Sequence, residues 1–316
     1  MGLMVLIVVL GIMNGFQENH ISRRIEIGSF HINISKKDFK TFSLKEVLEF
    51  KKTLYDNFNE FEAVVPYTDR EIILKIEKSA YVEDQIIKLR AIDPDEIIKD
   101  TKFLKYFKIT YGKFDLSEYS ALIGEALGYK ILSRIGAQIS LTPDLSLASL
   151  KNNGVPFNVS GFYYTGSYDY DRYWTFISLY GLAALTGKID IENVGIKLKD
   201  KSKQKEVLKK LNLFLKNGYD IQTDEDINRG FFAALKLEKA MILFLFIMIF
   251  IMVAINTFGS LKLTISEKRK NIAILKALGT KPKDIEIIFL IGTLLVSFLG
   301  SLTGVILGCF VVYNVM

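Results

Sequence analysis

The most prominent feature of the hydrophobic pattern is a pair of long stretches without a charged residue. The first runs from Ala240 to Leu261 and the second from Ile287 to Met316. Each is longer than the roughly 20 residues that an α-helix needs to cross about 30 Å of hydrocarbon. Buried helices of a soluble core are the alternative, but charge-free runs of this length are rare there. The pattern predicts two membrane spans, over residues 238–263 and 284–316.

A shorter apolar run stands at the N-terminus. The stretch MGLMVLIVVLGIM is followed by the polar stretch NGFQENHISRR. The run is too short to span, and it lacks the basic flank and the cleavage site of a signal peptide. Residues 1–16 are therefore predicted to be part of a first transmembrane helix.

Residues 17–237 carry strand and helix patterns in mixed order. Residues 31–39 have the pattern of a strand, and the segment that follows Ser43 has apolar residues at helical spacing. The stretch YGLAALTG predicts a short helix that Gly187 ends. We interpret the region as a large α+β domain inserted between the first and second spans.

The end of this domain, Glu225 to Lys239, has a helical pattern that leads directly into the apolar run at Ala240. A continuous helix would link the domain mechanically to the membrane, and we favour this interpretation. A helix that ends at the membrane interface is the alternative.

The distribution of charged residues predicts which side of the membrane each segment faces. Between Leu261 and Asp284, seven basic residues stand against two acidic ones, so this segment holds a net +5 of the chain's +6. Short loops rich in Lys and Arg stay on the cytoplasmic side, whereas long domains translocate regardless of charge. The pattern predicts a cytoplasmic loop at 264–283 and an outer domain at 17–237, and it argues against a nucleic-acid partner.

Candidate chemistry within the chain is sparse. The sequence has two histidines, His20 and His31, and one cysteine, Cys309, which are too few for a clustered metal site. The segment Gly181 to Lys188 resembles a phosphate loop, but five residues separate its glycines where four are required. The aromatic segment Gly161 to Phe176 fits cross-strand pairs in a sheet better than a base-stacking surface. We expect a chain that is not an enzyme and holds no cofactor, with ATP hydrolysed by another subunit.

Small residues recur in the last span. Gly300, Gly304 and Gly308 are four residues apart and share one helical face. Such faces let a second helix approach closely, although single glycines are also common in membrane helices. We predict that this face packs against another helix.

The basic loop contains its own short helix, in EKRKNIAILKALG. Asn271 is predicted as its N-cap, and Ile274, Leu275 and Leu278 fall on one face. Gly279 can end it in the left-handed conformation, and Pro282 can begin the next span. A helix on the membrane surface is the alternative, but two turns bury little, so docking into a partner's groove fits better.

Several stretches resemble the LolC/LolE family of lipoprotein-releasing permeases, within the MacB/FtsX-type ABC permeases. They are VVLGIMNGF, LIGEAL, FNVSGFYYTGSYDYD, VGIKLKD, FFAALKLEKAMIL and EKRKNIAILKALGT. The resemblance implies a bacterial inner-membrane protein of type VII ABC permease architecture. It has four spans, with a MacB-like periplasmic core after the first span and a cytoplasmic coupling helix between the second and third.

The resemblance also implies partners. A LolD-type ATPase would bind ATP and Mg²⁺ and receive the coupling helix, and a second permease subunit would complete the transporter in the membrane lipids. The cargo would be lipoproteins, which are passed to a periplasmic carrier. The residues expected to contact the ATPase are Glu267, Arg269, Ile272, Ile274, Leu275, Leu278 and Gly279.

Two further expectations come from the family. A hairpin that contacts the carrier would fall at Thr142 to Pro156, with Leu145, Leu147 and Leu150 as contacts, although an ordinary polar hairpin fits equally well. The family has a complete first span and a fourth span, and we expect these to be missing from this sequence. The alternative functions are a MacB-type efflux permease and a non-transporting FtsX-like scaffold or regulator.

Overall fold

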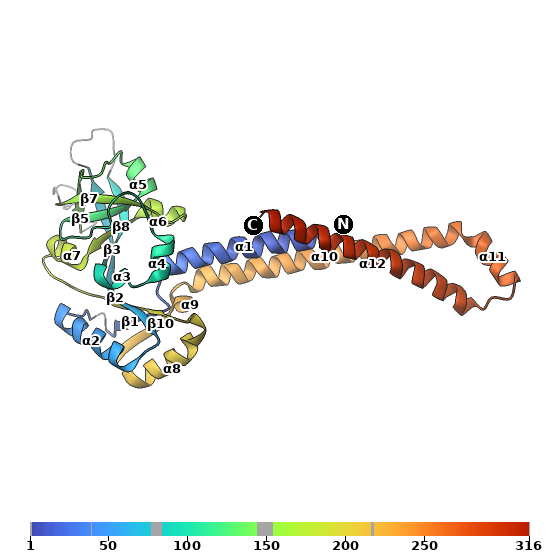
Figure 1. The fold of residues 1–316 in the computed structure, drawn as a ribbon, viewed down its shortest axis with the longest axis horizontal. Helices are drawn as coiled ribbons and strands as arrows, with labels where there is room; N and C mark the ends of the chain where they lie inside the picture. Colours follow the sequence, from blue (N-terminus) through green and yellow to red (C-terminus); the bar gives the residue numbers. More distant parts are fainter. Residues whose placement is uncertain (1, 39, 77–83, 144–153, 216–217, 316) are drawn as a thin grey trace. The chain divides into compact units, whose positions relative to one another are not determined.

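The computed structural model describes residues 2–38, 40–76, 84–143, 154–215 and 218–315 (Figure 1). The chain divides into two compact units. The folded unit is His20–Asn228, and the helical unit combines Met1–Asn19 with Arg229–Met316.

The described residues form the following elements. The helices are α1 (Gly2–Gly28), α2 (Leu44–Asn57), α3 (Pro94–Ile97), α4 (Thr101–Tyr106), α5 (Glu125–Lys130), α6 (Tyr168–Tyr173), α7 (Leu179–Thr186), α8 (Gln204–Leu215), α9 (Asp224–Ile227), α10 (Arg229–Glu267), α11 (Arg269–Ala277) and α12 (Pro282–Val315). The strands are β1 (Ile32–Lys36), β2 (Phe61–Lys75), β3 (Gln85–Ile92), β4 (Lys108–Gly112), β5 (Ser120–Gly124), β6 (Gln138–Thr142), β7 (Val155–Tyr164), β8 (Trp174–Ser178), β9 (Asn193–Leu198) and β10 (Tyr219–Thr223). The predicted α+β character of the domain is confirmed.

All of these strands belong to one mixed sheet. Its order is β10-β1-β9-β2-β3-β8-β5-β7-β4, and β6 pairs with both β2 and β7. The extra pairing closes a ring of strands, β2-β3-β8-β5-β7-β6. The long strand β2 belongs to both halves, because its first part pairs with β9 and its second part with β3 and β6.

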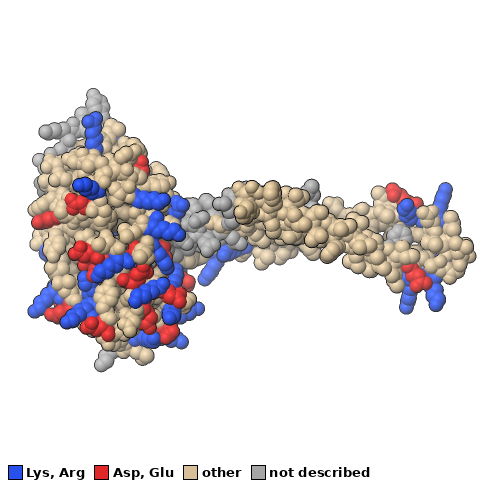
Figure 2. All heavy atoms as spheres, in the orientation of Figure 1, with Lys and Arg blue, Asp and Glu red and all other residues tan. Residues whose placement is uncertain are grey.

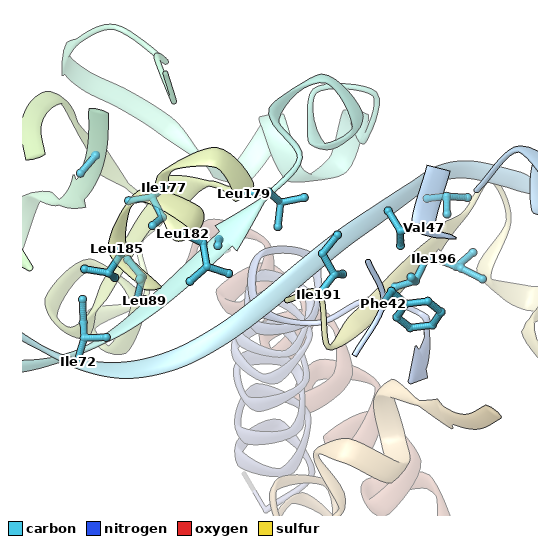
Figure 3. Packing of buried hydrophobic residues seen from close by; sticks show 14 of the residues in the cluster. Phe42, Val47, Ile72, Leu89, Ile177, Leu179, Leu182, Leu185, Ile191 and Ile196 are labelled. Carbon is cyan, nitrogen blue, oxygen red and sulfur yellow. The ribbon is translucent and has the colours of Figure 1, made fainter. Parts of the chain in front are cut away.

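Alternate side chains of the sheet supply two cores, since successive residues of a strand point to opposite faces. The first face packs against α2, α5, α7 and α8, and its apolar side chains include Phe42, Val47, Ile72, Leu89 and Leu182 (Figure 3).

The second face carries the aromatic core. Tyr163 stacks on Phe107 with ring centroids 4.3 Å apart, and Phe176 meets both rings edge-on. Phe30 lies flat on the sheet above Gly195, where a Cβ atom would come within 2.2 Å of the Phe30 ring. A glycine is therefore required at this position of β9.

Two predicted helix ends are confirmed by their hydrogen bonds. Ser43 and Glu46 form a reciprocal capping box at the start of α2. Gly187 ends α7 with φ 80°, so the segment that resembled a phosphate loop is a helix with a glycine cap.

Another prediction is wrong in part. The helix predicted from Glu225 to Lys239 is broken at Asn228, whose side chain donates to the Asp224 carbonyl and to Ser29 Oγ. The aromatic segment Gly161 to Phe176 begins in β7 and ends in β8, with the short helix α6 between the two strands.

Within the part of the chain that the structure describes, two helices are long and apolar enough to cross a membrane, α10 and the Pro282–Asn314 part of α12. They contain the two charge-free stretches. A shorter apolar segment, Met4–Met13, lies in α1.

Candidate functional site: the turn at α11 and the two connections to the folded unit

Helix α11 follows α10 after a break at Lys268. The Lys268 N–H donates to the Thr264 carbonyl at 3.0 Å, and the Lys268 carbonyl accepts from Ile272 at 3.0 Å. Helix α11 therefore begins at Arg269, and the prediction of Asn271 as N-cap is wrong. The chain turns three residues earlier because the Lys268 carbonyl already accepts the first hydrogen bond of the new helix.

The end of α11 is the predicted left-handed glycine. Gly279 has φ 87° and donates to the Lys276 carbonyl at 3.0 Å. Thr280 donates to the Leu275 carbonyl at 3.1 Å, which completes a Schellman motif. Pro282 then occupies the first position of α12, as predicted.

Three apolar side chains of α11 and its C-cap are exposed within the described chain. Ile274, Leu275 and Leu278 expose 59%, 37% and 79% of their surface. The seven residues assigned to ATPase contact all lie on this one turn, and Figure 2 shows charged side chains reappearing around it after the uncharged surface of α10 and α12. Monomeric soluble proteins rarely expose large apolar patches, and such patches often mark interaction sites, so this surface is a candidate docking face.

A groove lined by apolar side chains and several hydroxyl and amide groups lies between α10 and α12. It has a volume of about 750 Å³. Asn256, Thr257, Ser260 and Thr264 line it from α10, and Ser297 lines it from α12. Thr257 donates to its own helix, at the Val253 carbonyl. The groove therefore places hydrogen-bonding groups inside an otherwise apolar helix pair.

The three predicted packing glycines of α12 have different surroundings. A Cβ atom on Gly308 would lie 3.1 Å from the Ile7 Cβ atom of α1. Gly304 is buried, whereas a Cβ atom on Gly300 would meet no described atom within 4 Å. On the facing helix, a Cβ atom on Gly11 would lie 2.7 Å from Val312. Helices α1 and α12 thus approach closely at the Gly308 end of the predicted stripe.

The C-terminal end of α1 is held by a buried lysine from strand β9. Lys197 exposes 1% of its surface, and its Nζ atom donates to the Glu26 carbonyl at 3.2 Å and to Glu26 Oε2 at 2.6 Å. Asp100 Oδ2 lies 3.6 Å from the same ammonium, and His31 Nε2 lies 3.7 Å from Glu26 Oε1. The last carbonyls of a helix carry negative partial charge, so a cation at this position is favourable.

Burial and ion pairing have opposite effects on these carboxyl groups. Burial raises the pKa of Glu26, but contacts with His31 and Lys197 outweigh it and lower the pKa to about 2. The His31 distance of 3.7 Å is too long for a conventional hydrogen bond, so we attribute more of the effect to Lys197. For Asp100, burial dominates and raises the pKa despite Lys197.

A second buried cation, Arg90 of β3, reaches the next carbonyl of α1. Its Nη1 atom donates to the Ile27 carbonyl at 3.4 Å. Its other nitrogens form a bidentate pair with Asp69 at 2.6 and 2.7 Å, and its plane lies over Tyr67 and Trp174. Two strands of the sheet therefore each send a cation to the last turn of α1.

The second connection to the folded unit, through α9, is built differently. Asp224 is buried and accepts from Lys201 at 2.7 Å and from Gln204 at 2.9 Å. The chain then leaves helical geometry at Asn228, with φ −99° and ψ 28°. Asn228 donates to Ser29 Oγ at 2.9 Å, which joins the two connections side by side within the folded unit.

The sequence reasoning missed the cluster around Lys197, although one signal was present. Lys197 stands between buried Ile196 and Leu198 and follows Val194 and Gly195 in a strand. A charged residue inside a buried apolar strand needs a buried counter-charge. The predicted carrier-contact residues Leu145, Leu147 and Leu150 lie outside the described residues.

Two protein-family models match this chain. The MacB-like periplasmic core domain family matches residues 1–213, and the FtsX-like permease C-terminal family matches residues 242–315.

Curated relatives match along nearly the whole chain. The lipoprotein-releasing system transmembrane protein LolC of Neisseria meningitidis is 28% identical, over 100% of this chain and 75% of its own length. LolC of Xylella fastidiosa is 25% identical, over 99% and 75%, and LolC of Haemophilus influenzae is 26% identical, over 99% and 76%. The resemblance to the LolC/LolE family is confirmed.

Solved structures also match. The extracellular domain of the transporter YknZ from Gram-positive bacteria matches with 16% identity and a TM-score of 0.42, over 61% of this chain and 99% of that chain. The periplasmic region of MacB from Actinobacillus actinomycetemcomitans matches with 15% identity and a TM-score of 0.42, over 66% and 95%. On the family matches, the chain belongs to the MacB-like periplasmic core family and is an ABC transporter permease of the MacB/FtsX type.

Proposed function

We propose that this chain is the permease subunit of a transporter that extracts lipoproteins from the outer leaflet of the bacterial inner membrane and passes them to a periplasmic carrier. A separate ATPase of the LolD type supplies the energy, and a second permease subunit completes the assembly. The named LolC relatives support the cargo, because the relatives in three bacteria carry the name of a lipoprotein-releasing system.

The observation that carries the coupling role is the open apolar face of α11. Ile274, Leu275 and Leu278 project from a two-turn helix that a Schellman motif ends sharply at Gly279. Short helices of this kind bind by laying an apolar face into a partner's groove. The basic residues of the same turn support a cytoplasmic location by the positive-inside rule, and a cytoplasmic turn would be accessible to an ATPase.

An energy source is necessary for such a reaction. Exposing acyl chains to water costs about 0.8 kcal/mol per CH₂ group, so a triacylated anchor amounts to tens of kcal/mol. ATP binding in the partner would move α11, and the motion would pass through α10 and α12 to the periplasmic domain.

The coupling role is tested by a charge placed on either side of α11. The variant Leu275→Asp should lose co-purification with the ATPase by about tenfold or more, because it buries a charge in the proposed groove. The matched variant Ala273→Asp adds the same charge on the opposite face and should co-purify normally. Equal co-purification of the two variants would remove α11 from the proposal.

A backbone variant tests the same turn independently. Gly279→Val places a β-branched residue at φ 87°, which costs about 1–3 kcal/mol and should shift the end of α11. Association with the ATPase should weaken while the thermal unfolding of the folded unit stays unchanged.

The cargo is tested with the full transporter in proteoliposomes. Addition of a triacylated lipoprotein should stimulate ATP hydrolysis and release the lipoprotein to a soluble carrier. Stimulation by peptides or drugs instead would favour a MacB-type efflux permease, and stimulation by none would favour an FtsX-like regulator. Deleting Ser146 to Asn153 should abolish carrier binding if the hairpin has the proposed contact role.

A further inference from the structure

The ends of two parallel strands bring two short helices of the folded unit together. Strand β5 runs parallel to β7, and Gly124 at the end of β5 lies opposite Tyr163 near the end of β7. Helix α5 follows β5 directly, and α6 follows β7 after a short loop (Figure 1). A Cβ atom on Gly124 would lie 2.1 Å from the carbonyl oxygen of Asp171 in α6, so the two segments approach closely. Side chains from α5, α6 and the end of β7 therefore meet at one edge of the sheet.

A pocket with a volume of about 390 Å³ lies at this edge. We call it the tyrosine pocket, and the residues that line it are Glu125, Ala126, Tyr129, Tyr164, Gly166, Tyr168 and Asp171. Its three tyrosines expose between 48% and 66% of their surface. Exposed tyrosines that gather in one place are typical of protein–protein interfaces.

The tyrosine pocket is also acidic. Glu125 and Asp171 supply two carboxylates, and none of the described residues that line the pocket is a lysine or an arginine. Burial raises the pKa of Asp171, hydrogen bonds from Thr165 lower it, and the charge of Glu125 raises it again. Arg23 donates to the Gly166 carbonyl at 3.4 Å, but among the described residues it forms no ion pair with either carboxylate. Carboxylates beside aromatic rings favour a guanidinium group, which stacks on the rings and pairs with the acids.

The turn that follows α5 has complementary properties. Leu132 has φ 52°, a left-handed conformation that glycine usually adopts at the end of a helix. Its side chain nevertheless exposes 75% of its surface, and Ile135 is exposed as well. Arg134 lies between them, is exposed, and has no acidic partner among the described residues. A leucine that is both strained and exposed contributes little to its own fold. We call Leu132, Arg134 and Ile135 the basic knob.

The tyrosine pocket and the basic knob lie at the two ends of the same short helix. Helix α5 comprises the six residues Glu125–Lys130 and is therefore about 9 Å long. A surface that carries both halves of a contact can pair with a copy of itself about a two-fold axis, and each contact is then made twice.

We propose that the folded units of two copies of this chain dock through α5, with Arg134 of each copy in the tyrosine pocket of the other, beside Glu125. Leu132 and Ile135 then cover exposed tyrosine rings. Lys130 lies between Glu125 and Arg134 in the sequence and comes near the two-fold axis, where its long side chain can turn to water. Such a contact is small, so it forms where two copies are held in one assembly at high effective concentration. It makes the second permease subunit a copy of this chain. That consequence rests on the proposed function, whereas the docking itself does not.

The proposal is tested by cross-linking single-cysteine variants of the full-length chain, assembled with the ATPase in proteoliposomes. Cys309 is the one cysteine of the chain, so Cys309→Ser with Lys130→Cys leaves a single thiol on α5. A short bifunctional thiol reagent should link two copies through position 130. Lys45→Cys on α2 replaces another exposed lysine and is the matched control, which should give little product. Equal product at the two positions, both with and without ATP, would overturn the proposal.

Charge reversal tests whether Glu125 and Arg134 are the partners. Glu125→Arg and Arg134→Glu should each lower cross-linking at position 130 by about tenfold or more, because like charges then face each other twice. The two reversals combined in one chain should restore it, because each contact again pairs opposite charges. Glu49→Arg and Lys45→Glu make the same reversals on α2 and should leave cross-linking unchanged. Circular dichroism shows whether each variant is folded. A folded double variant that does not recover would overturn the proposal.

The apolar part of the basic knob is tested by a variant that relieves the backbone. Leu132→Gly suits φ 52°, so the folded unit should unfold at the same or a higher temperature, whereas cross-linking at position 130 should fall. Leu213→Ala removes another exposed leucine, on α8, and should leave cross-linking unchanged. Full cross-linking in Leu132→Gly would overturn the role of Leu132 in the contact.

Release of lipoprotein by the same proteoliposomes separates this contact from the proposed function. If no lipoprotein is released while cross-linking follows the charges as stated, the proposed function fails and the docking of two copies stands. If lipoprotein is released and position 130 gives no more product than the α2 control, the docking through α5 fails and the proposed function stands.

Discussion

In the folded unit, the rings of Phe107, Tyr163 and Phe176 are buried and pack against one another, whereas on α10 Phe250 and Phe258 expose 76% and 73% of their surface. No described side chain of α10 is buried. The folded unit buries its own apolar surface and can carry its own stability. The helical unit depends on lipid or neighbouring helices to cover its surface. The two units should therefore respond independently to substitution.

The largest expected effect is on the aromatic core. Phe176→Ala removes a ring that contacts Phe107 and Tyr163, so the free energy of unfolding of the folded unit should fall by about 3–5 kcal/mol. The fluorescence of Trp174, the one tryptophan of the chain, measures this transition alone. Phe250→Ala on α10 is the control and should leave it unchanged. A similar loss in both variants would contradict the independence of the two units.

The next effect is a pH dependence at the end of α1. The pKa of Glu26 is lowered to about 2 from 4.5. The stabilisation of the folded unit by the ionised Glu26 carboxylate is therefore fully present above pH 4.5 and is lost as the pH falls toward 2. A shift of this size corresponds to about 3 kcal/mol at neutral pH. Protonation of Asp100, whose pKa is raised, partly offsets the loss.

The variant Glu26→Gln isolates this contribution. Its free energy of unfolding should lie about 3 kcal/mol below that of the unmodified chain at pH 7, and the difference should shrink toward zero near pH 2. Glu49→Gln, an exposed position on α2, serves as the control. A difference for Glu26→Gln that stays constant with pH would show that its ionisation does not stabilise the folded unit.

A smaller effect distinguishes two glycines of α12. Gly308→Leu overpacks the contact with Ile7 and should cost about 1–3 kcal/mol of α1–α12 packing, whereas Gly300→Leu has open space in this chain. The packing is measured by disulfide formation between Gly11→Cys and Val312→Cys in a Cys309→Ser background. Gly308→Leu should reduce cross-linking and Gly300→Leu should not. Loss of assembly with a second subunit in Gly300→Leu would assign that face to an external helix.

Local signals in the sequence predicted local structure well. Ser43 with Glu46, Gly187, Gly279 and Pro282 each mark a helix end that the structure shows. These signals work because a cap is decided by a few neighbouring residues. The start of α11 was missed because a backbone hydrogen bond at Lys268, rather than a capping side chain, decides it.

The remaining features depend on residues far apart in the chain. Glu26 and Lys197 are 171 positions apart, so sequence spacing does not reveal that the two residues form an ion pair. The break at Asn228 follows from its bond to Ser29, which a helical pattern cannot reveal. The coupling residues on α11 were identified by position and resemblance, and their contact with an ATPase stays a prediction.

The place of strand β1 in the sheet has a consequence for the order of events during synthesis. Strand β1 pairs with β9 and β10, so its two neighbours are made almost last. Helix α1 is therefore synthesised long before Lys197, the residue that holds its C-terminal end. Strand β10 finishes just before α10 begins, so the domain completes its sheet as the next apolar helix emerges. Pairing at such sequence separation is slow, and open strand edges attract other chains while they wait. Strand β1 therefore keeps both of its edges open through most of the synthesis of the folded unit.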